Sequence, residues 1–353
     1  MKVIVAMSGG VDSAVCAYLI KQNNDALGIT LRLHDESDSL IYGENSCCSV
    51  KDIADAKSVC NIIGIPHETH DFGAEFKECV ISDFINCYKN GSTPNPCVIC
   101  NRKIKFEQLL KIAMERGYDA ITTGHYARIE KGENGRYLLK KALDLSKDQS
   151  YVLYSLTQEQ LAHTIFPLGE MTKAEARNLA EHIGFVNARK KDSQDVCFIP
   201  DGDYVSFIEQ TTGETFEKGN FIDLNGNILG THQGIIKYTI GQRKGLGLAL
   251  GEPMYVIEKN VENNTVTLAK NEELFGTTLT ASNINLISCE KIEKPLKIKA
   301  KIRYNQKEQP ATVEQIGKDL IKVTFDEPQR AITRGQSVVL YEGDTVVGGG
   351  IIN

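Results

Sequence analysis

The residue types best suited to chemistry gather at three places: the string SGGVDS at 8–13, the pair Cys97 and Cys100, and Cys197. An apolar run at 3–7 precedes the first string, and a helix-compatible stretch at 14–22 follows it. A strand, a glycine turn and a helix start together present backbone N–H groups at the positive end of a helix dipole, which suits phosphate. A bare glycine pair is common in ordinary turns, but the whole hexapeptide directly after an N-terminal strand predicts a phosphate site. No lysine follows the glycines, so the loop differs from GxxxxGK[ST].

Cys97 and Cys100 form a CxxC in a proline-stiffened loop, TPNPCVIC, just before a helix expected at 103–116. Thiols near a helix N-terminus have lowered pKa values and raised reactivity. The pair fits a redox couple, half of a zinc site or part of an iron–sulfur site, and no second CxxC completes a zinc ribbon. Cys197 lies at another polar-to-apolar transition. Cysteines inside helix-like segments are assigned to packing: Cys16, Cys60, Cys79 and Cys87.

The composition is that of an ordinary globular protein: 353 residues, of which 41% are hydrophobic and 24% charged, with a net charge of −6. No apolar run approaches the ~20 residues of a membrane span, and the first residues do not resemble a signal peptide. A cytoplasmic location is therefore expected, without a membrane partner. The ten cysteines then favour packing, metal binding or catalysis over disulfides.

Three blocks follow along the chain. Residues 1–200 alternate strand-like and helix-like segments, which predicts an α/β domain with a doubly wound, mostly parallel sheet. Such sheets bind ligands at the carboxyl ends of strands near a switch point, where SGGVDS and Gly124-His125 are expected. Residues 201–276 are glycine-rich and form a small central domain, and 277–353 read as short strands of an antiparallel barrel.

The third block carries an unexpected charge. From Thr277 onward there are 11 Lys and Arg against 9 Asp and Glu, a balance of +2, so the preceding residues carry −8. Strand alternation places four basic side chains on one face: Lys297, Lys299, Lys301 and Arg303. A solvated strand face is one interpretation. The other is a bound anion such as a nucleic-acid backbone, since like charges on one face repel each other.

Together these residues resemble the tRNA-specific 2-thiouridylases, members of the PP-loop ATP pyrophosphatase superfamily. Six strings carry the resemblance: AMSGGVDSAV at 6–15, TPNPCVICNRKIKF at 93–106, TTGHYAR at 122–128, KDQSYVLYSL at 147–156, KKDSQDVCFIP at 190–200 and YTIGQRKGLG at 238–247. The resemblance implies a PP-loop domain, a central domain and a C-terminal β-barrel. It also implies adenylation of the C2 oxygen of a wobble uridine by ATP, followed by sulfur transfer that gives 2-thiouridine.

The resemblance also assigns roles to individual residues. Asp12 would help to hold Mg²⁺, while Leu31 and Gly124 would border the nucleotide. The ATP phosphates would bind at Ala6, Met7, Ser8, Gly9, Gly10, Val11, Asp12 and Ser13. The target base would face Asn95, Pro96 and Cys97. Further tRNA contacts would come from His125, Lys147, Asp148, Gln149, Arg303, Tyr304 and Gln336.

In the family, a persulfide forms on the cysteine that matches Cys197, and the cysteine that matches Cys100 is the second catalytic thiol. Many members have aspartate at the position of Cys97. The extra thiol leaves two interpretations: a persulfide relay, which we expect first, or a [4Fe–4S] cluster on Cys97, Cys100 and Cys197. The implied partners are tRNAs with a wobble uridine (lysine, glutamate and glutamine acceptors) and a sulfur-relay protein or cysteine desulfurase.

Two other classes compete with this interpretation. A PP-loop amidotransferase or ligase acting on a small molecule, similar to argininosuccinate and GMP synthases, would share SGGxDS. It would not explain three loop cysteines or a basic barrel strand. An RNA-binding module with a degenerate nucleotide site is opposed by the intact SGGVDS.

Overall fold

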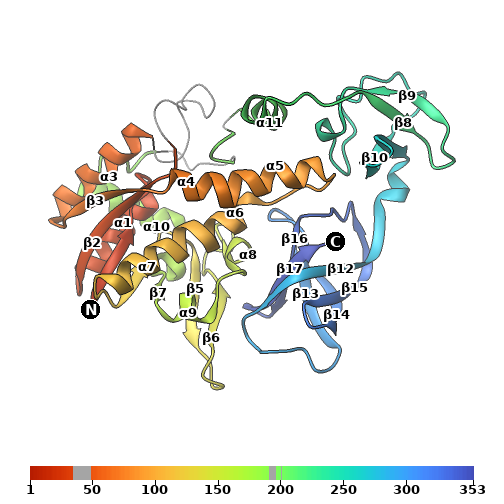
Figure 1. The fold of residues 1–353 in the computed structure, drawn as a ribbon. Coiled ribbons are helices and arrows are strands. Elements are labelled where there is room, and N and C mark those ends of the chain that lie inside the picture. The colour runs from red at the N-terminus through yellow and green to blue at the C-terminus, as the bar shows by residue number, and fades with distance from the viewer. Residues whose placement is uncertain (35–48, 191–195, 200) are drawn as a thin grey trace.

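The computed structural model describes residues 1–34, 49–190, 196–199 and 201–353 (Figure 1). Its N-terminal domain is built on a parallel sheet whose described strands run in the order β3-β2-β1-β4-β7. The central strand β1 pairs with β2 on one side and β4 on the other, so the turn after β1 lies at the switch point. The expected doubly wound sheet is confirmed. The strands are β1 (Lys2–Ala6), β2 (Asp25–Arg32), β3 (His67–Asp71), β4 (Ala120–Thr122) and β7 (Thr164–Ile165).

Helices cover both faces of this sheet. Side chains of β1 alternate between the two faces, and each face packs into its own apolar cluster. Val3 and Val5 pack into a cluster with helices α1 (Val11–Lys21), α3 (Val50–Ile63) and α10 (Lys173–Ile183). Ile4 belongs to the other cluster, which includes α7 (Glu107–Glu115). Within the described chain, no helix is long and apolar enough to cross a membrane.

The CxxC lies inside a helix rather than before one. Helix α6 (Pro96–Ile99) runs on through a π-helical segment, η3 (Cys100–Phe106), into α7. The expected start near Lys103 was therefore too late, because Pro96 opens the helix at its first turn, where proline loses no hydrogen bond. π-Helical turns are rare and are frequent at functional sites.

A second helical arm runs beside the cysteine helix. It consists of α4 (Gly73–Phe76), a π-helical segment η2 (Lys77–Ile81) and α5 (Ser82–Lys89), and it contacts α6 and η3 (Figure 1). The ring of Tyr88 in α5 stacks on Tyr204 at a centroid distance of 4.4 Å. Tyr204 opens α11 (Tyr204–Thr212), so this stacking attaches the central domain to the arm.

The central domain carries its own small sheet, with described strands in the order β10-β11-β8-β9. Its core includes Phe221, Val256 and Leu268, all fully buried. The Nζ atom of Lys259 lies 5.9 Å from the centroid of the Tyr88 ring, on the side that faces the arm. The strands are β8 (Gly219–Ile222), β9 (Ile228–His232), β10 (Tyr255–Asn260) and β11 (Thr265–Ala269).

The C-terminal strands close into an antiparallel barrel in the order β12-β15-β14-β13-β16-β17, and pairing of β12 with β17 completes the ring. This barrel was expected, and its first strand begins at Phe275. Alternation along β13 is also confirmed, because Ile298 and Ala300 point into the barrel core. The strands are β12 (Phe275–Leu286), β13 (Leu296–Lys301), β14 (Gln309–Gly317), β15 (Leu320–Arg330), β16 (Ser337–Glu342) and β17 (Thr345–Ile352).

A hairpin of the N-terminal domain extends the barrel sheet. Strands β5 (Ala127–Lys131) and β6 (Tyr137–Lys141) pair with each other, and Lys140 of β6 pairs with Thr345 of β17. Arg128 donates to the Asp344 carboxylate at 2.7 Å. The short helices α8 (Ser150–Leu153) and α9 (Gln158–Ala162) follow, and buried Tyr151 of α8 donates to the Ser337 carbonyl at 2.9 Å. The barrel is thus fixed to the N-terminal domain by both sheet pairing and side chains.

Candidate active site

The phosphate loop folds as its sequence predicts. Gly9 has a φ of +72°, and a Cβ atom there would lie 2.4 Å from the Asp52 carbonyl oxygen, so only glycine fits. Ser13 Oγ donates to the Gly10 carbonyl at 2.9 Å and accepts from the Ser8 amide at 3.2 Å. Within the described residues no side chain caps the N-terminus of α1, which begins one residue after Gly10. The N–H groups of its first turn are therefore available to an anion.

The end of β4 forms a second wall of the loop. A Cβ atom at Gly124 would lie 2.8 Å from the Ser13 amide nitrogen, so this glycine lets β4 approach the start of α1. Leu31 lies near the end of β2, beyond the last β1 residue in the register. Its side chain is 6% exposed and that of Met7 is 2% exposed, so both offer mainly backbone to a nucleotide. The residues expected to bind ATP do meet at one edge of the sheet.

Asp12 is the carboxylate nearest the loop, and two side chains hold it. Lys173 Nζ lies 2.7 Å from each of its oxygens, and the Tyr126 hydroxyl donates to Oδ1 at 2.9 Å. The Lys173 side chain is only 9% exposed. A capping box formed by Thr172 and Glu175 fixes the start of α10 and therefore the position of Lys173. A buried ammonium needs such a partner.

Residues that the sequence analysis missed also hold the backbone of the phosphate loop through hydrogen bonds. Asn187 Nδ2 and Lys190 Nζ donate to the Gly9 carbonyl at 3.0 and 3.2 Å. Lys190 also pairs with Asp52 and Asp55 at the start of α3. Burial lowers the pKa of Lys190, but the two carboxylates outweigh burial and raise it overall. No local signal reveals this contact, because about 180 residues separate the partners.

The three cysteines differ in exposure. Cys97 is exposed in the first turn of α6, whereas Cys100 is buried where the π-helical segment begins. Cys197 is half-buried and packs against the same apolar cluster that contains Cys100. Its neighbour Phe198 is anchored in edge-to-face contact with Phe84, at 5.3 Å between ring centroids. Residues 191–195 and Pro200 of the same string lie outside the described part of the chain.

Three of the helix cysteines assigned to packing have raised thiol pKa values. Burial raises the pKa of Cys16 to about 12, and Cys16 Sγ lies 3.0 Å from Thr122 Oγ1. Burial likewise raises the pKa of Cys60 to about 12 and that of Cys87 to about 11. At neutral pH these thiols stay protonated and unreactive. Cys47 and Cys48 lie outside the described residues.

Most of the residues expected at the tRNA interface converge where the barrel meets the cysteine helix. Gln336 of the barrel hydrogen-bonds the loop that leads to Asn95, Pro96 and Cys97. The Tyr304 hydroxyl donates to the Asp148 carbonyl at 3.3 Å. Burial raises the pKa of Tyr304 first, and the charge of Asp148 raises it further. Three segments distant in sequence therefore share one surface.

Some of these side chains already have structural partners. The Asp148 carboxylate accepts from the Ser150 hydroxyl at 2.7 Å, and Gln149 Oε1 accepts from the Tyr126 amide at 2.9 Å. His125 is buried, shares a 2.7 Å hydrogen bond with Thr123, and has a pKa well below its usual value because of burial and then Lys105. Its neutral ring lies beneath the surface, and its contact with tRNA stays a prediction.

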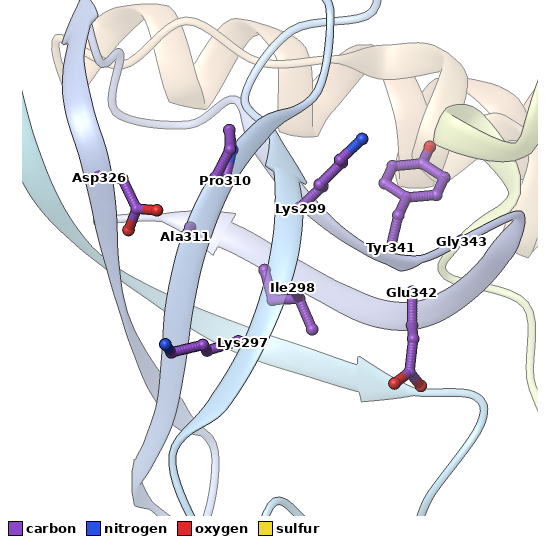
Figure 2. Close-up of a pocket in the computed structure, with 9 residues that line it drawn as sticks. All are labelled: Lys297, Ile298, Lys299, Pro310, Ala311, Asp326, Tyr341, Glu342 and Gly343. Atoms are coloured by element: carbon purple, nitrogen blue, oxygen red, sulfur yellow. The ribbon is translucent and has the colours of Figure 1, made fainter.

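The basic strand is not uniform. Lys297 and Lys299 are exposed and line a surface cavity of ≈ 390 Å³ on the barrel with Tyr341 and Glu342, as Figure 2 shows. Lys301 is half-buried, with Nζ 5.6 Å from the Tyr151 ring centroid and 5.5 Å from that of Tyr304. Arg303 is half-buried too, and its Nη2 donates to the Ala331 carbonyl at 2.6 Å. Only the first two lysines are therefore fully presented to solvent.

Metal-binding capacity is limited in the described part of the chain. No group of three His, Cys, Asp or Glu side chains there is arranged to hold a metal ion. Cys97, Cys100 and Cys197 are all described, and they do not form such a group. Mg²⁺ usually binds through one or two carboxylates together with substrate phosphates, and Asp12 beside the phosphate loop fits that pattern.

Comparison with known proteins divides the chain into three matches. The tRNA methyl transferase HUP domain family matches residues 1–201, its PRC-barrel domain 205–270, and the aminomethyltransferase β-barrel domain 276–352. The tRNA-specific 2-thiouridylase MnmA of Clostridioides difficile is 51% identical over 353 residues, covering 99% of this chain and 98% of that protein. The protein of the same name from Acetivibrio thermocellus is 49% identical, covering 99% of each.

Proposed function

The chain belongs to the tRNA-specific 2-thiouridylase family, and from that membership we propose that it is a tRNA-uridine 2-sulfurtransferase that converts ATP to AMP and diphosphate. The observation that carries the proposal is likeness to these enzymes at about half identity over essentially the whole chain. The geometry supports it, since a phosphate loop, a helix with two cysteines and a basic barrel strand belong to one connected body. A ligase for a small molecule would need neither the cysteines nor the barrel.

The first half-reaction uses the phosphate loop. The loop and the first turn of α1 bind the phosphates of ATP, and Asp12 would help to hold Mg²⁺, which would neutralise phosphate charge. The uridine C2 oxygen attacks the α-phosphorus and diphosphate leaves. The product carries AMP on that oxygen, which makes C2 electrophilic and AMP a good leaving group.

The second half-reaction uses the cysteines. A persulfide on Cys197 donates its terminal sulfur to C2, and AMP departs with the former C2 oxygen. Attack of the Cys100 thiolate on the Cys197 sulfur breaks the S–S bond and leaves a Cys100–Cys197 disulfide. An external thiol reductant must then reopen it.

Cys97 is the residue that the relay does not need. Because the three cysteines do not form a metal-binding group, we route no step through a cluster. We propose instead that the exposed Cys97 lies at the surface where the target base enters. The base pocket would comprise Asn95, Pro96 and Cys97.

The RNA partner is a tRNA with a wobble uridine, which would be a lysine, glutamate or glutamine acceptor. Contacts would come from Lys147, Asp148, Gln149, Arg303, Tyr304 and Gln336, with His125 behind them. The persulfide sulfur would be supplied by a sulfur-relay protein or a cysteine desulfurase. An enzyme that acts on tRNA in this way would work in the cytoplasm.

The decisive experiment measures AMP release and 2-thiouridine in one assay. Purified protein, ATP, Mg²⁺, a persulfide donor and unmodified tRNA should give both products, with 2-thiouridine detected by mass spectrometry of digested tRNA. A ligase would form AMP without tRNA when its small substrate is added, and an RNA-binding module would form no AMP. Absence of 2-thiouridine under all these conditions would refute the proposal.

A further inference from the structure

Asp12 is connected to the segment 144–149 by way of Tyr126. The Tyr126 hydroxyl donates to Asp12 Oδ1 at 2.9 Å. At the other end of the same residue, its amide donates to Gln149 Oε1 at 2.9 Å, and its carbonyl accepts from the Gln149 amide at 2.9 Å. Tyr126 is 2% exposed, so its ring has little freedom to turn away.

A second connection reaches the same carboxylate through Lys173. Its Nζ contacts both Asp12 oxygens at 2.7 Å, and its backbone amide donates to Asp144 Oδ2 at 3.1 Å. Asp144 also accepts a hydrogen bond from the Lys147 amide through its backbone carbonyl, at 3.0 Å. The two connections therefore start at one carboxylate and end in one six-residue stretch, 144–149.

Two residues of that stretch, Leu145 and Ser146, are exposed where RNA is proposed to bind, and the other four are half-buried. Leu145 is 71% exposed, and Leu143, just before the stretch, is 63% exposed. Beside them lies Lys147, and Asp148 accepts from the barrel residue Tyr304. An RNA bound to the barrel and to this stretch would contact the residues that hydrogen-bond Tyr126 and Lys173.

We propose that Tyr126 and Lys173 are positioning residues for Asp12, and that they couple binding of RNA at 144–149 to the geometry of the ATP site. The proposal rests on the proposed function, since it takes the RNA to be tRNA. Both residues hold the carboxylate in one orientation. Contacts made by RNA with the 144–149 stretch then change how firmly that orientation is kept, so ATP is activated mainly when the acceptor is present.

The coupling is measured as a ratio of two affinities. The dissociation constant of α,β-methylene-ATP with Mg²⁺, which the enzyme cannot cleave, is determined by calorimetry with and without saturating unmodified tRNA. Wild-type protein should bind the analogue at least about five-fold more tightly with tRNA, the lower end of typical coupling between sites. By linkage, the analogue should tighten tRNA binding by the same factor.

Tyr126→Phe removes one hydroxyl and leaves the ring in place. Its affinity ratio should fall towards 1, and the affinity of the analogue without tRNA is measured beside it so that the ratio isolates the coupling. Lys173→Met should lower the rate of AMP formation with tRNA by more than ten-fold, whereas Lys173→Arg, which retains the charge, should restore part of it. Tyr18→Phe and Lys21→Met, on the same helix as Asp12, serve as matched controls and should keep the wild-type ratio.

The outcomes separate this proposal from the proposed function. A wild-type ratio of 1 in an enzyme that still makes 2-thiouridine would overturn the coupling and leave the activity intact. An unchanged ratio in Tyr126→Phe would also overturn it. Thermal unfolding of each variant reports whether it is folded. A lower affinity ratio in a variant with the wild-type melting temperature supports a positioning role and not a loss of the fold.

Discussion

The side-chain amide of Gln336 donates hydrogen bonds to the carbonyl oxygens of Thr93 at 2.9 Å and Pro94 at 3.1 Å. Gln336 belongs to the barrel, and Thr93 begins the loop that leads into the cysteine helix. In return, the Thr93 amide donates to the Arg334 carbonyl at 2.9 Å. The barrel thus holds the approach to Cys97 from both sides of one peptide segment.

Gln336→Ala should reduce thiolation while leaving ATP binding unchanged. Removing each hydrogen bond weakens the hold on the loop by about 1 kcal/mol, so the 2-thiouridine yield should fall several-fold. Equilibrium binding of an ATP analogue and tRNA thiolation are measured side by side. Gln309→Ala, which removes a half-buried barrel side chain that donates to the Lys307 carbonyl, is the matched control. Equal thiolation by Gln336→Ala and wild type would show that the loop is held by other contacts.

Asp12→Asn should abolish AMP formation and keep tRNA affinity in the absence of nucleotide within a few-fold of wild type, because Asp12 is not among the proposed RNA contacts. The amide keeps the shape of the side chain but cannot hold Mg²⁺ as a charged ligand. It also deprives buried Lys173 of its counter-ion, so the melting temperature should fall as well. Near wild-type AMP formation by Asp12→Asn would contradict the assignment of the phosphate loop.

The exposed part of the basic strand should set the salt dependence of tRNA binding. Replacing Lys297 and Lys299 together with alanine should lower the slope of log affinity against log salt by about 0.7–0.9 for each phosphate group that the variant no longer neutralises. The half-buried Lys301 packs over two tyrosine rings, so Lys301→Ala should instead lower stability. Titrations of the protein with tRNA at several salt concentrations measure this slope. An unchanged slope in the double variant would mean that these two lysines are merely solvated.

The sulfur chemistry is tested by serine replacements. Cys100→Ser and Cys197→Ser should each abolish thiolation, whereas Cys97→Ser should stay partly active with sulfane sulfur detectable on Cys197. Cys16→Ala, which removes a buried protonated thiol, should keep activity. If Cys97→Ser loses iron, brown colour and activity together after anaerobic reconstitution, the cluster mechanism replaces the relay. Full activity of Cys197→Ser would defeat both mechanisms.

Lys259 should make the central domain more stable at alkaline pH. Burial lowers the pKa of this amine to about 8, and Nζ has no hydrogen-bond partner among the described residues. Between about pH 8 and the ordinary value of 10.5, the unfolded chain binds more protons than the folded one, so stability rises with pH. Lys259→Met should therefore raise the melting temperature at pH 7 and have a smaller effect at pH 10. An equal effect at both pH values would contradict burial of the charge.

Periodicity and motif order were sufficient to predict the parallel sheet, the phosphate loop and the barrel. These features depend on local signals, such as the apolar run before SGGVDS and the strict alternation around Ile298. The start of the cysteine helix at Pro96 was missed because the two prolines suggested a loop, although proline at the first helical position favours a helix.

The contacts that organise the site could not be predicted in the same way. Lys173 and Lys190 reach the loop from segments more than 160 residues away, and no local pattern marks either of them. The same holds for the half-burial of Lys301, because strand alternation gives the face of a side chain but not what packs on that face.

The pairing of β6 with β17 has a consequence for which RNA substrates the enzyme accepts. Since the N-terminal domain and the barrel share one sheet, we expect the distance from the cysteine helix to the exposed lysines to be set during folding and not on binding. The conformational entropy lost in orienting the N-terminal domain and the barrel is then lost on folding, before RNA binds. This favours a substrate whose length matches the distance between the cysteine helix and the lysines. We therefore expect the enzyme to select an anticodon arm by its rigid dimensions, so that a stem one base pair longer is excluded even when its wobble uridine is unchanged.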